Sequence, residues 1–518
     1  MTKLSFSTDN RHLPDWALLA TVFVTGACVL IIELMGTRIL APYFGSGIYT
    51  WSALIAVTLA ALALGYSFGG RLADRLPRVD ILYNLCLAAG LWTLSTPMLA
   101  RPLLPLMIQI SDLRIGVLVS SLILYFPNLF LLGAIGPFVI RLMTRDREVV
   151  GSVSGRVFAV STVGSLLGAL GTGFILIPNY GVLAIFAFCG SLLLAVAIAG
   201  NFRPKFIGYA TVLAVILVLL TLVTGRGPVS NDSIEVLEQT PSVYGQLQVI
   251  RKPGQKSLLV DGIGQNYVYD NDIYSSAYIN FIAALPKLHQ AAADPNRNAL
   301  VIGLGAGQLP MLLQQQGLDT EAVEIDPEIG AIATRHFDFD LPPDRIHYTD
   351  GRVFLLRSDK AYAYIVIDAF SAEQVAWHLV SLEALTEAKA RLSDRGLLAI
   401  NLTSIAAGQD VAALHNTLKA AFPHVRSFSL EHDSGLTSIV LLASGSPVLL
   451  DINSTMLPAS QLEDVKRFVA GEMTDLHSDI LLTDDYNPIG YQRRQVQLMW
   501  REVMIDYLGE DRLGWLLL

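Results

Sequence analysis

Three glycines and two acids in this sequence have the spacing of a nucleoside-binding site. In NALVIGLGAGQLPMLLQQQGLDTEAVEIDPEIG, an apolar run leads into Gly303, Gly305 and Gly307, and a second apolar run ends in Glu324 and Asp326. Glycines let the backbone approach a ligand closely, and a carboxylate at a strand end accepts hydrogen bonds from both ribose hydroxyls. A third acid, Asp350, follows in YTDGRVFLL. The spacing predicts a nucleoside or dinucleotide site, and the alternative is a glycine turn with a purely structural role.

These residues need a sheet to bring them together, and the sequence around them predicts one. Short apolar runs alternate with helical segments: ALVIGL, EAVEI, YAYIVIDAF and GLLAINL are the strand candidates. This alternation is typical of a parallel sheet with helices on both faces, in which ligands bind at the carboxyl ends of the strands.

The first half of the chain has a different composition from the second. Of 518 residues 53% are hydrophobic, and the mean hydropathy is +0.49. Residues 1–228 hold 15 Lys and Arg against 8 Asp and Glu, whereas the remainder holds 21 and 37. An acidic second half argues against nucleic acid as a partner, because phosphate binding needs a basic face.

Apolar runs of membrane-spanning length recur through the first half. They predict seven transmembrane helices, at about 16–40, 49–68, 81–100, 115–142, 156–177, 181–200 and 206–224. The first run is too long for a cleaved signal peptide and leads into another span. Pro127 interrupts the fourth span, and GSLLGALGTG makes the fifth rich in small residues that allow close helix packing. Cys28, Cys86 and Cys189 lie in these runs and offer neither a disulfide framework nor a cysteine zinc site.

Two polar clusters stand out in the apolar half. Glu33 and Arg38 lie in IIELMGTRILAPYFG, where a charge within a span is unfavourable unless it is paired or faces a cavity. Either Glu33 and Arg38 pair with each other, or they have a functional role. The second cluster is GYSFGGRLADRLPR, which resembles the loop between the second and third helices of major-facilitator transporters, with a turn at its small residues.

The chain changes character after TLVTGRGPVSNDS, where Gly, Pro, Ser and Asn replace apolar residues. We therefore expect a membrane domain of about seven helices at 1–228. Strand-like segments such as YGQLQVIRK and KSLLVDGIGQ predict a β-rich lead-in at 229–290. A Rossmann-like, methyltransferase-type domain is expected at 291–518.

Five segments of the second half resemble the polyamine aminopropyltransferases, the spermidine synthase family, over roughly residues 242–490. SVYGQLQV resembles the entry strand of that family, and LLVDGIGQNYVYDNDIY resembles its Asp-Gly-x-x-Gln segment with a following tyrosine. VEIDP, TDGRVFL and YIVIDAF resemble its ribose, adenine and catalytic segments. A seven-helix membrane segment fused to such a domain is a known bacterial arrangement.

The resemblance implies a role for each matching residue. Gln265 and Tyr274 line the site, Glu324 holds the ribose, Asp350 faces the adenine, and Asp368 is the general base. The co-substrate implied is decarboxylated S-adenosylmethionine, or S-adenosylmethionine in a methyltransferase-like enzyme, with no metal. The partners implied are a small-molecule amine, the adenosyl substrate and the lipid bilayer, without nucleic acid, and a homodimer is allowed.

Two positions depart from the family pattern. Ala306 stands where the family carries an aspartate before the last glycine, which would hold the cationic amine of the donor. Ser371 stands where a second aspartate would anchor the acceptor amine. His378, Glu383 and Glu373 could restore some polarity near the pocket, and for His378 the alternative is a helix-capping or packing role.

Three functions therefore stay open: a membrane-anchored aminopropyltransferase, a methyltransferase-like enzyme, and a transporter or sensor whose second half binds a nucleoside or polyamine without chemistry. Each places the chain in a bacterial inner membrane. With seven spans, eleven Lys and Arg fall on the side of the N-terminus and four on the other. Positive residues gather in the cytoplasm, which favours residues 229–518 outside, whereas adenosyl donors are cytosolic and favour the inside.

Overall fold

The computed structural model divides the chain into two compact units, the apolar helices and Ser230–Gly509, and each is described by itself. The structure describes residues 13–45, 47–108, 110, 112–144, 149–201, 230–231, 234–270, 276–289, 295–369, 375–406, 408–452 and 457–508.

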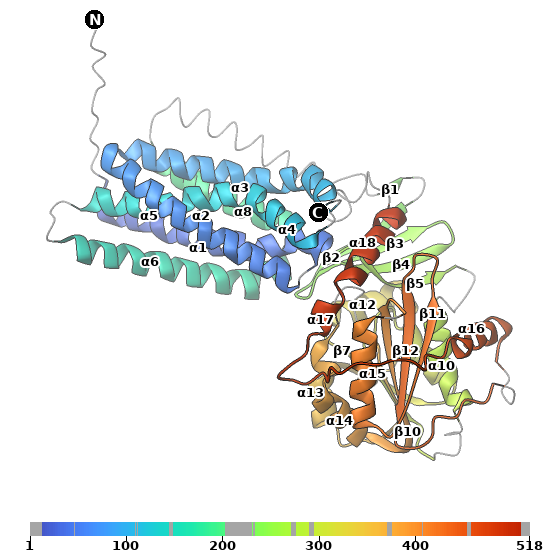
Figure 1. The fold of residues 1–518 in the computed structure, drawn as a ribbon. Coiled ribbons are helices and arrows are strands. Elements are labelled where there is room, and N and C mark those ends of the chain that lie inside the picture. Colours follow the sequence, from blue (N-terminus) through green and yellow to red (C-terminus); the bar gives the residue numbers. More distant parts are fainter. Residues whose placement is uncertain are drawn as a thin grey trace, which may run out of the picture. The chain divides into compact units, whose positions relative to one another are not determined.

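The first unit is made of long apolar helices (Figure 1). They are α1 (Asp15–Phe44), α2 (Ile48–Arg75), α3 (Val79–Met107), α4 (Leu113–Leu124), α5 (Phe126–Met143), α6 (Val150–Gly171), a π-helical turn (Thr172–Leu176), α7 (Ile177–Asn179) and α8 (Val182–Gly200). Within the described residues, six helical stretches are long and apolar enough to cross a bilayer. They correspond to the first six predicted spans, and the seventh, at 206–224, lies outside the described residues.

The interruption predicted at Pro127 is confirmed. The apolar run at 115–142 forms two helices, because α4 ends at Leu124 and α5 begins at Phe126, with Pro127 in its first turn. Proline has no N–H to donate and is tolerated at that position, where the N–H has no helical partner.

Glycines in the membrane-type helices allow close packing of neighbouring backbones. A Cβ on Gly164 of α6 would lie 2.1 Å from the carbonyl oxygen of Phe23 in α1. A Cβ on Gly168 would lie 2.6 Å from the carbonyl oxygen of Ala27, also in α1. The small residues of the predicted fifth span therefore pack as expected.

The turn expected at the small residues of GYSFGGRLADRLPR is wrong. Helix α2 continues through Gly69 and Gly70 to Arg75. A Cβ on Gly69 would lie 2.3 Å from the carbonyl oxygen of Ala134 in α5. The glycine serves a close helix crossing, so its lack of a side chain does not mark a turn.

Five antiparallel strands form a small sheet at the start of the second unit. They are β1 (Ser230–Asn231), β2 (Ile234–Pro241), β3 (Gln246–Lys252), β4 (Gln255–Val260) and β5 (Ile263–Tyr269), in the order β1-β2-β3-β4-β5. The two strand-like segments expected in the lead-in lie within β3, β4 and β5.

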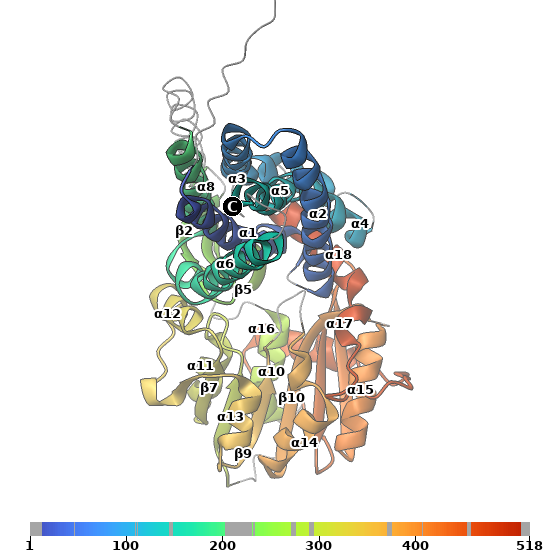
Figure 2. The same ribbon diagram turned by 90° about the vertical axis from the view of Figure 1, so that its left-hand side faces the viewer.

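The predicted parallel sheet with helices on both faces is confirmed (Figures 1 and 2). Its strands are β6 (Asn298–Ile302), β7 (Asp319–Glu324), β8 (Ile346–Tyr348), β9 (Tyr362–Ile367), β10 (Leu392–Ser404), β11 (His424–Glu431) and β12 (Thr437–Ser444). The order is β11-β12-β10-β9-β6-β7-β8, with β12 antiparallel to both of its neighbours and the pairs from β10 to β8 parallel. Strand β6 lies between β7 and β9, so the order reverses there, and such a point is where open sheets bind ligands.

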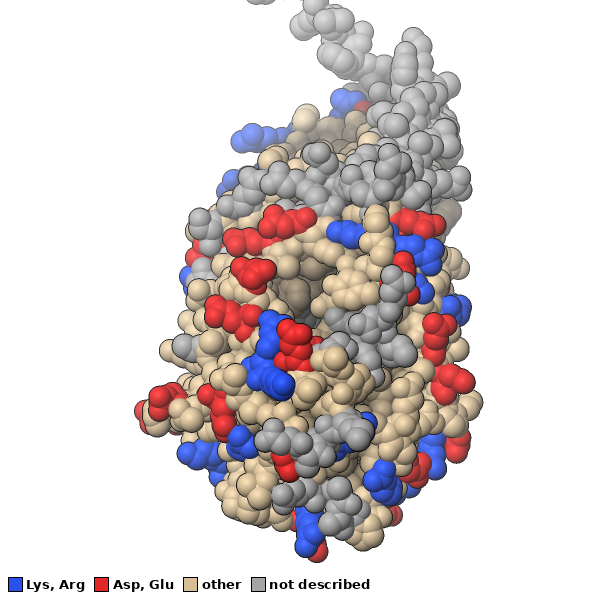
Figure 3. Space-filling view, turned by 90° about the vertical axis from the view of Figure 1, so that its right-hand side faces the viewer, with Lys and Arg blue, Asp and Glu red and all other residues tan. Residues whose placement is uncertain are grey.

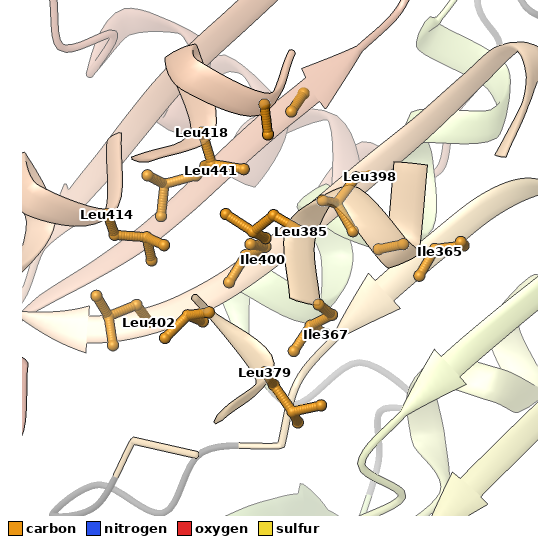
Figure 4. Close-up of a cluster of buried hydrophobic side chains, with 14 of the residues drawn as sticks. Ile365, Ile367, Leu379, Leu385, Leu398, Ile400, Leu402, Leu414, Leu418 and Leu441 are labelled. Atoms are coloured by element: carbon orange, nitrogen blue, oxygen red, sulfur yellow. The ribbon is translucent and has the colours of Figure 1, made fainter. Parts of the chain in front are cut away.

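Helices cover the sheet on two faces, each with its own apolar core. One core joins the sheet to α10 (Ala277–Leu288), α11 (Gln308–Gln315) and α16 (Ala459–Ala470). The other joins it to α13 (Gly351–Arg357), α14 (Leu382–Ala390), α15 (Gln409–Ala421) and α17 (Ile489–Gln492). Figure 4 shows part of this second core, with Ile365 and Ile367 of β9, Leu398, Ile400 and Leu402 of β10, and helix residues Leu385, Leu414 and Leu418 packed together.

Two further helices position parts of the site. Helix α12 (Pro327–His336) follows β7, and α18 (Arg494–Leu508) contacts β5. The hydroxyl of Tyr507 in α18 lies 2.8 Å from that of Ser257 in β4. Just before α18, the fully buried Arg493 pairs with the fully buried Asp410 of α15 at 2.9 Å. A buried charge needs such a partner, so this pair fixes where the last segment crosses the domain.

Candidate functional site

The glycine loop between β6 and α11 adopts a conformation that glycine alone tolerates well. Gly303, Gly305 and Gly307 have φ angles of +99°, +52° and +80°. A Cβ on Gly303 would lie 2.3 Å from the carbonyl oxygen of Asp368, and a Cβ on Gly305 would lie 1.9 Å from Oδ1 of Asn266. The three glycines therefore fold the loop tightly against the end of β9 and against β5.

Glu324 ends β7 and turns toward this loop. Its Oε2 accepts a hydrogen bond from the N–H of Leu304 at 3.0 Å, and its Oε1 accepts one from the N–H of Asp326 at 3.0 Å. The side chain is buried, and burial raises its pKa above the ordinary value. The backbone N–H of Ile325 also acts on this carboxylate. A carboxylate has about four acceptor sites, so Glu324 retains capacity to accept from a ligand hydroxyl.

A turn between β2 and β3 is fastened beside Glu324. The hydroxyl of Ser242 bonds to the buried carboxylate of Asp326 at 2.5 Å, and the N–H of Tyr244 donates to Ser242 Oγ at 3.1 Å. Tyr244 is about half exposed, and its partial burial together with the charges of Asp326, Asp350 and Glu324 raises the pKa of its phenol. The charges of three carboxylates of the site therefore act on this phenol.

Asp350 caps helix α13 and contacts His378. Its Oδ1 accepts from the N–H groups of Arg352 and Val353 at 2.9 and 3.1 Å, and its Oδ2 hydrogen-bonds to Nε2 of His378 at 2.8 Å. Burial alone would raise the pKa of this carboxyl, but the helix N–H groups and His378 outweigh it and hold the pKa below its ordinary value. Asp350 is therefore a carboxylate at neutral pH.

Asp368 follows β9 at the same edge of the sheet. Its Oδ1 accepts from Nδ2 of Asn401 at 2.8 Å, and its Oδ2 accepts from the hydroxyl of Tyr278 at 3.3 Å. Burial raises the pKa of Asp368 to about 7, although both hydrogen bonds oppose the shift. A carboxyl group that titrates near neutral pH is suited to accept a proton during a reaction.

The structure brings together Gly303, Gly305, Gly307, Glu324, Asp350 and Asp368 at the carboxyl ends of β6, β7, β8 and β9, and His378 joins them through its contact with Asp350. Gln265 lies in β5 and donates to the carbonyl oxygen of Ile263 in the same strand at 3.3 Å. Glu383 is exposed at the start of α14 and accepts from the N–H of Asp484 at 3.0 Å. Tyr274, Ser371 and Glu373 lie outside the described residues.

The two membrane candidates, Glu33 and Arg38, both lie half-buried in α1. Five positions along a helix turn by roughly 140°, so the two side chains leave on different sides of the helix. Their pairing stays a prediction.

Three residues of the site were missed from the sequence: Asn266, Tyr278 and Asn401. Asn266 accepts from the N–H of Ala306 at 3.1 Å, and its Nδ2 lies 3.5 Å from the hydroxyl of Tyr278. Of the three, Asn401 had the clearest signal in the sequence, because it is the lone amide in the apolar run LLAINL. Asn266 directly follows Gln265, and successive strand residues point to opposite faces, so the pairing register was needed to tell the two apart.

Charged side chains of both signs lie on the face drawn in Figure 3, where Asp and Glu as well as Lys and Arg side chains border a hollow. Among the described residues, no group of three or more His, Cys, Asp or Glu side chains is placed to hold a metal ion.

Among known proteins, the relatives of this chain include a methyltransferase and polyamine aminopropyltransferases. No family model matches the chain. An N-terminal histidine N-methyltransferase of Emericella nidulans is 38% identical over 142 residues, which are 26% of this chain and 25% of that protein. A polyamine aminopropyltransferase of Vibrio vulnificus is 32% identical over 154 residues, 29% of this chain and 51% of that protein. The matches thus span about a quarter and about half of these two relatives.

A longer match is to the polyamine aminopropyltransferase of Corynebacterium efficiens, 26% identical over 463 residues, 81% of this chain and 84% of that protein. The spermidine synthase of Thermotoga maritima is a similar solved structure, with a TM-score of 0.34 and 18% identity over 50% of this chain and 83% of that one.

The resemblance to the polyamine aminopropyltransferases is confirmed at the level of homology. The residues after 228 make up little over half of the chain, so a match over 81% of it also includes part of the apolar half. The chain is therefore homologous to proteins of that name across both of its parts.

Proposed function

We propose that this chain is a membrane-anchored aminopropyltransferase that moves an aminopropyl group from decarboxylated S-adenosylmethionine to an amine. The adenosine part of the donor lies against the glycine loop, with its ribose hydroxyls on Glu324 and its adenine amino group near Asp350. The apolar helices hold the enzyme in a lipid bilayer. The homologues named polyamine aminopropyltransferase support this substrate class.

The observation that carries the proposal is the partly buried carboxyl of Asp368, whose pKa is raised to about 7 beside the glycine loop. In the reaction, the amine nitrogen attacks the methylene carbon next to the sulfonium. The carbon–sulfur bond breaks, its electron pair returns to sulfur to leave methylthioadenosine, and the new ammonium loses a proton to Asp368. The site therefore has to hold the reactants in line and accept one proton.

The second candidate is methyl transfer from S-adenosylmethionine to an amine, for which two observations speak. One relative is named an N-methyltransferase. Ala306, in place of the aspartate of the family, is buried in an apolar cluster with Leu247, Val249, Leu258, Ile332 and Phe337. Asp368 could accept the proton in this reaction as well, so the two candidates differ in the donor.

The experiment is an initial-rate assay of the purified full chain with each donor and a panel of amines, including putrescine and spermidine. Aminopropyl transfer releases methylthioadenosine, and methyl transfer releases S-adenosylhomocysteine. We expect methylthioadenosine to form with decarboxylated S-adenosylmethionine and not with the Asp368→Asn variant. Exclusive release of S-adenosylhomocysteine would establish the second candidate instead.

A further inference from the structure

His378 lies in a short turn, Trp377–Leu379, whose backbone is held from two sides. The carbonyl oxygen of Trp377 accepts a hydrogen bond from Nδ2 of Asn487 at 3.0 Å. The carbonyl oxygen of His378 lies 3.4 Å from a guanidinium nitrogen of Arg352. The place of the imidazole is thus set by contacts that do not involve its ring.

Arg352 is itself fixed by two carboxylates. Its guanidinium donates two hydrogen bonds to Glu387 of α14, both at 3.0 Å, and two to Asp484, both at 2.7 Å. Paired bonds of this kind fix direction as well as distance. Because Arg352 lies in the first turn of α13, the helix that Asp350 caps, these bonds join the turn of His378 to the backbone beside Asp350.

Capping of α14 does not account for His378. That helix is capped by the hydroxyl of Ser381, which accepts from the N–H of Ala384 at 3.2 Å. The ring of His378 contacts Asp350 instead, and both side chains are partly exposed. A ligand can therefore reach the carboxylate on which the ring acts.

Three acceptor positions of the Asp350 carboxylate are occupied by protein donors. Oδ1 accepts from the N–H groups of Arg352 and Val353 at 2.9 and 3.1 Å. Oδ2 lies 2.8 Å from Nε2 of His378, and because a carboxylate can only accept, Nε2 carries the hydrogen. A carboxylate has about four acceptor positions, so the contacts of the described residues leave about one, on Oδ2.

We infer that His378 is a positioning residue that sets the base specificity of the site, because it holds Asp350 so that Oδ2 offers a single acceptor to the amino group of adenine. The N–H groups of α13 fix Oδ1 and the imidazole fixes Oδ2, so the carboxylate does not turn to suit another base. A base with a carbonyl oxygen in place of the amino group brings no hydrogen to Oδ2 and is rejected. The inference rests on the proposed function in one respect, namely that the adenine of the donor lies at Asp350.

The test compares two nucleosides that differ in the base alone. Methylthioadenosine has an amino group where methylthioinosine has a carbonyl oxygen, so the ratio of their dissociation constants reports the contact of the base with Asp350. We measure this ratio by titration calorimetry on the full chain at neutral pH. The variants are His378→Gln, whose amide nitrogen can take the place of Nε2, His378→Asn, whose side chain is one carbon shorter, and His378→Leu.

The matched control is His336→Leu. It breaks a second contact between a histidine and a carboxylate in the same unit, in which Nε2 of His336 lies 2.6 Å from Glu238. A histidine that only stabilises the fold should change the affinities of both nucleosides alike and leave their ratio as it is. The melting temperature of each variant is recorded beside the ratio.

The wild type should bind methylthioadenosine roughly 10- to 100-fold more tightly than methylthioinosine, which is the strength of a hydrogen bond to a charged group. In His378→Leu and His378→Asn this ratio should fall by roughly 3- to 10-fold, because Asp350 keeps its charge and loses only its orientation. In His378→Gln the ratio should recover to within about twofold of the wild type, since the donor to Oδ2 is restored. The Asn and Gln variants carry the same amide, so they keep the test decisive if His378→Leu does not fold.

The possible failures are distinct. Failure of the wild type to bind either nucleoside would overturn the proposed function, and the inference with it. Tight binding of methylthioadenosine with an unchanged or larger ratio in His378→Leu and His378→Asn would overturn the inference alone. An equal fall of the ratio in His336→Leu, or the same ratio in the Asn and Gln variants, would do so as well.

Discussion

Replacing Asp368 with asparagine should stabilise the fold at alkaline pH while removing transferase activity. The pKa of Asp368 rises from its ordinary 3.8 to about 7 on folding, so the folded state keeps the proton to higher pH than the unfolded state. The stability from the neutral carboxyl is complete below about pH 4 and is lost as the pH rises through about 7. Asparagine has the shape of the neutral acid and no charge to bury.

The magnitude follows from the size of the shift. Three units correspond to at most about 4 kcal/mol at 1.36 kcal/mol per unit, and roughly two thirds of this falls between pH 5 and pH 8. Asp368 is only partly buried by exposed area, so water screens some of the effect and about 1–2 kcal/mol is expected. For a domain of this size that is roughly 2–5 °C in melting temperature.

The assay is thermal unfolding of the full chain in detergent micelles, followed by tryptophan fluorescence at pH 5 and pH 8. The melting temperature of Asp368→Asn relative to wild type should increase between the two pH values. Asp359→Asn, at an exposed position, is the control and should show no such increase. A difference between variant and wild type that is the same at both pH values would refute the raised pKa of Asp368.

Three further predictions concern the nucleoside, the donor amine and the membrane. Glu324→Gln should weaken the binding of methylthioadenosine roughly 10- to 100-fold in titration calorimetry, because two ribose hydroxyls lose a charged acceptor. The control variant Glu321→Gln, changed three residues earlier in β7, should bind methylthioadenosine with wild-type affinity. Equal losses of affinity in the two variants would refute the ribose site. Ala306→Asp should lower the melting temperature, since its carboxylate would be buried among apolar side chains, and decarboxylated S-adenosylmethionine should restore more of the loss than methylthioadenosine does; no difference between the two ligands would contradict a nearby donor amine. An alkaline phosphatase fused at Leu518 should be active if the charge bias places the second unit outside, whereas an inactive phosphatase and a fluorescent fusion protein would place it inside.

The sequence predicted those parts of the fold that depend on local pattern. Apolar run length gave the membrane-type helices, and the alternation from ALVIGL to GLLAINL gave the parallel strands. The turn predicted at Gly69 was wrong, because a glycine that permits a helix crossing and a glycine that permits a turn cannot be told apart without the partner helix. Nor did the sequence pattern account for β12, which lies antiparallel between β10 and β11 and pairs with β10 by contacts distant in sequence.

The site divides in the same way. Glu324, Asp350 and Asp368 could be predicted because each ends or follows a recognisable strand, and parallel strands place their carboxyl ends at one edge of the sheet. Asn266 and Tyr278 depend instead on how the small antiparallel sheet and α10 lie against the glycine loop within the second unit. That arrangement is tertiary, and a one-residue change in the register of β5 would exchange Asn266 for Gln265.

The most direct test of the account is the pH dependence of group transfer in a single turnover of the full chain with decarboxylated S-adenosylmethionine and an amine. If Asp368 accepts the proton, the rate should rise about tenfold per pH unit below about 7 and level off above it, and Asp368→Asn should lose this dependence together with the activity. A rate in the wild type that is flat from pH 5 to 8, or a variant that keeps both the rate and its pH dependence, would contradict the central claim.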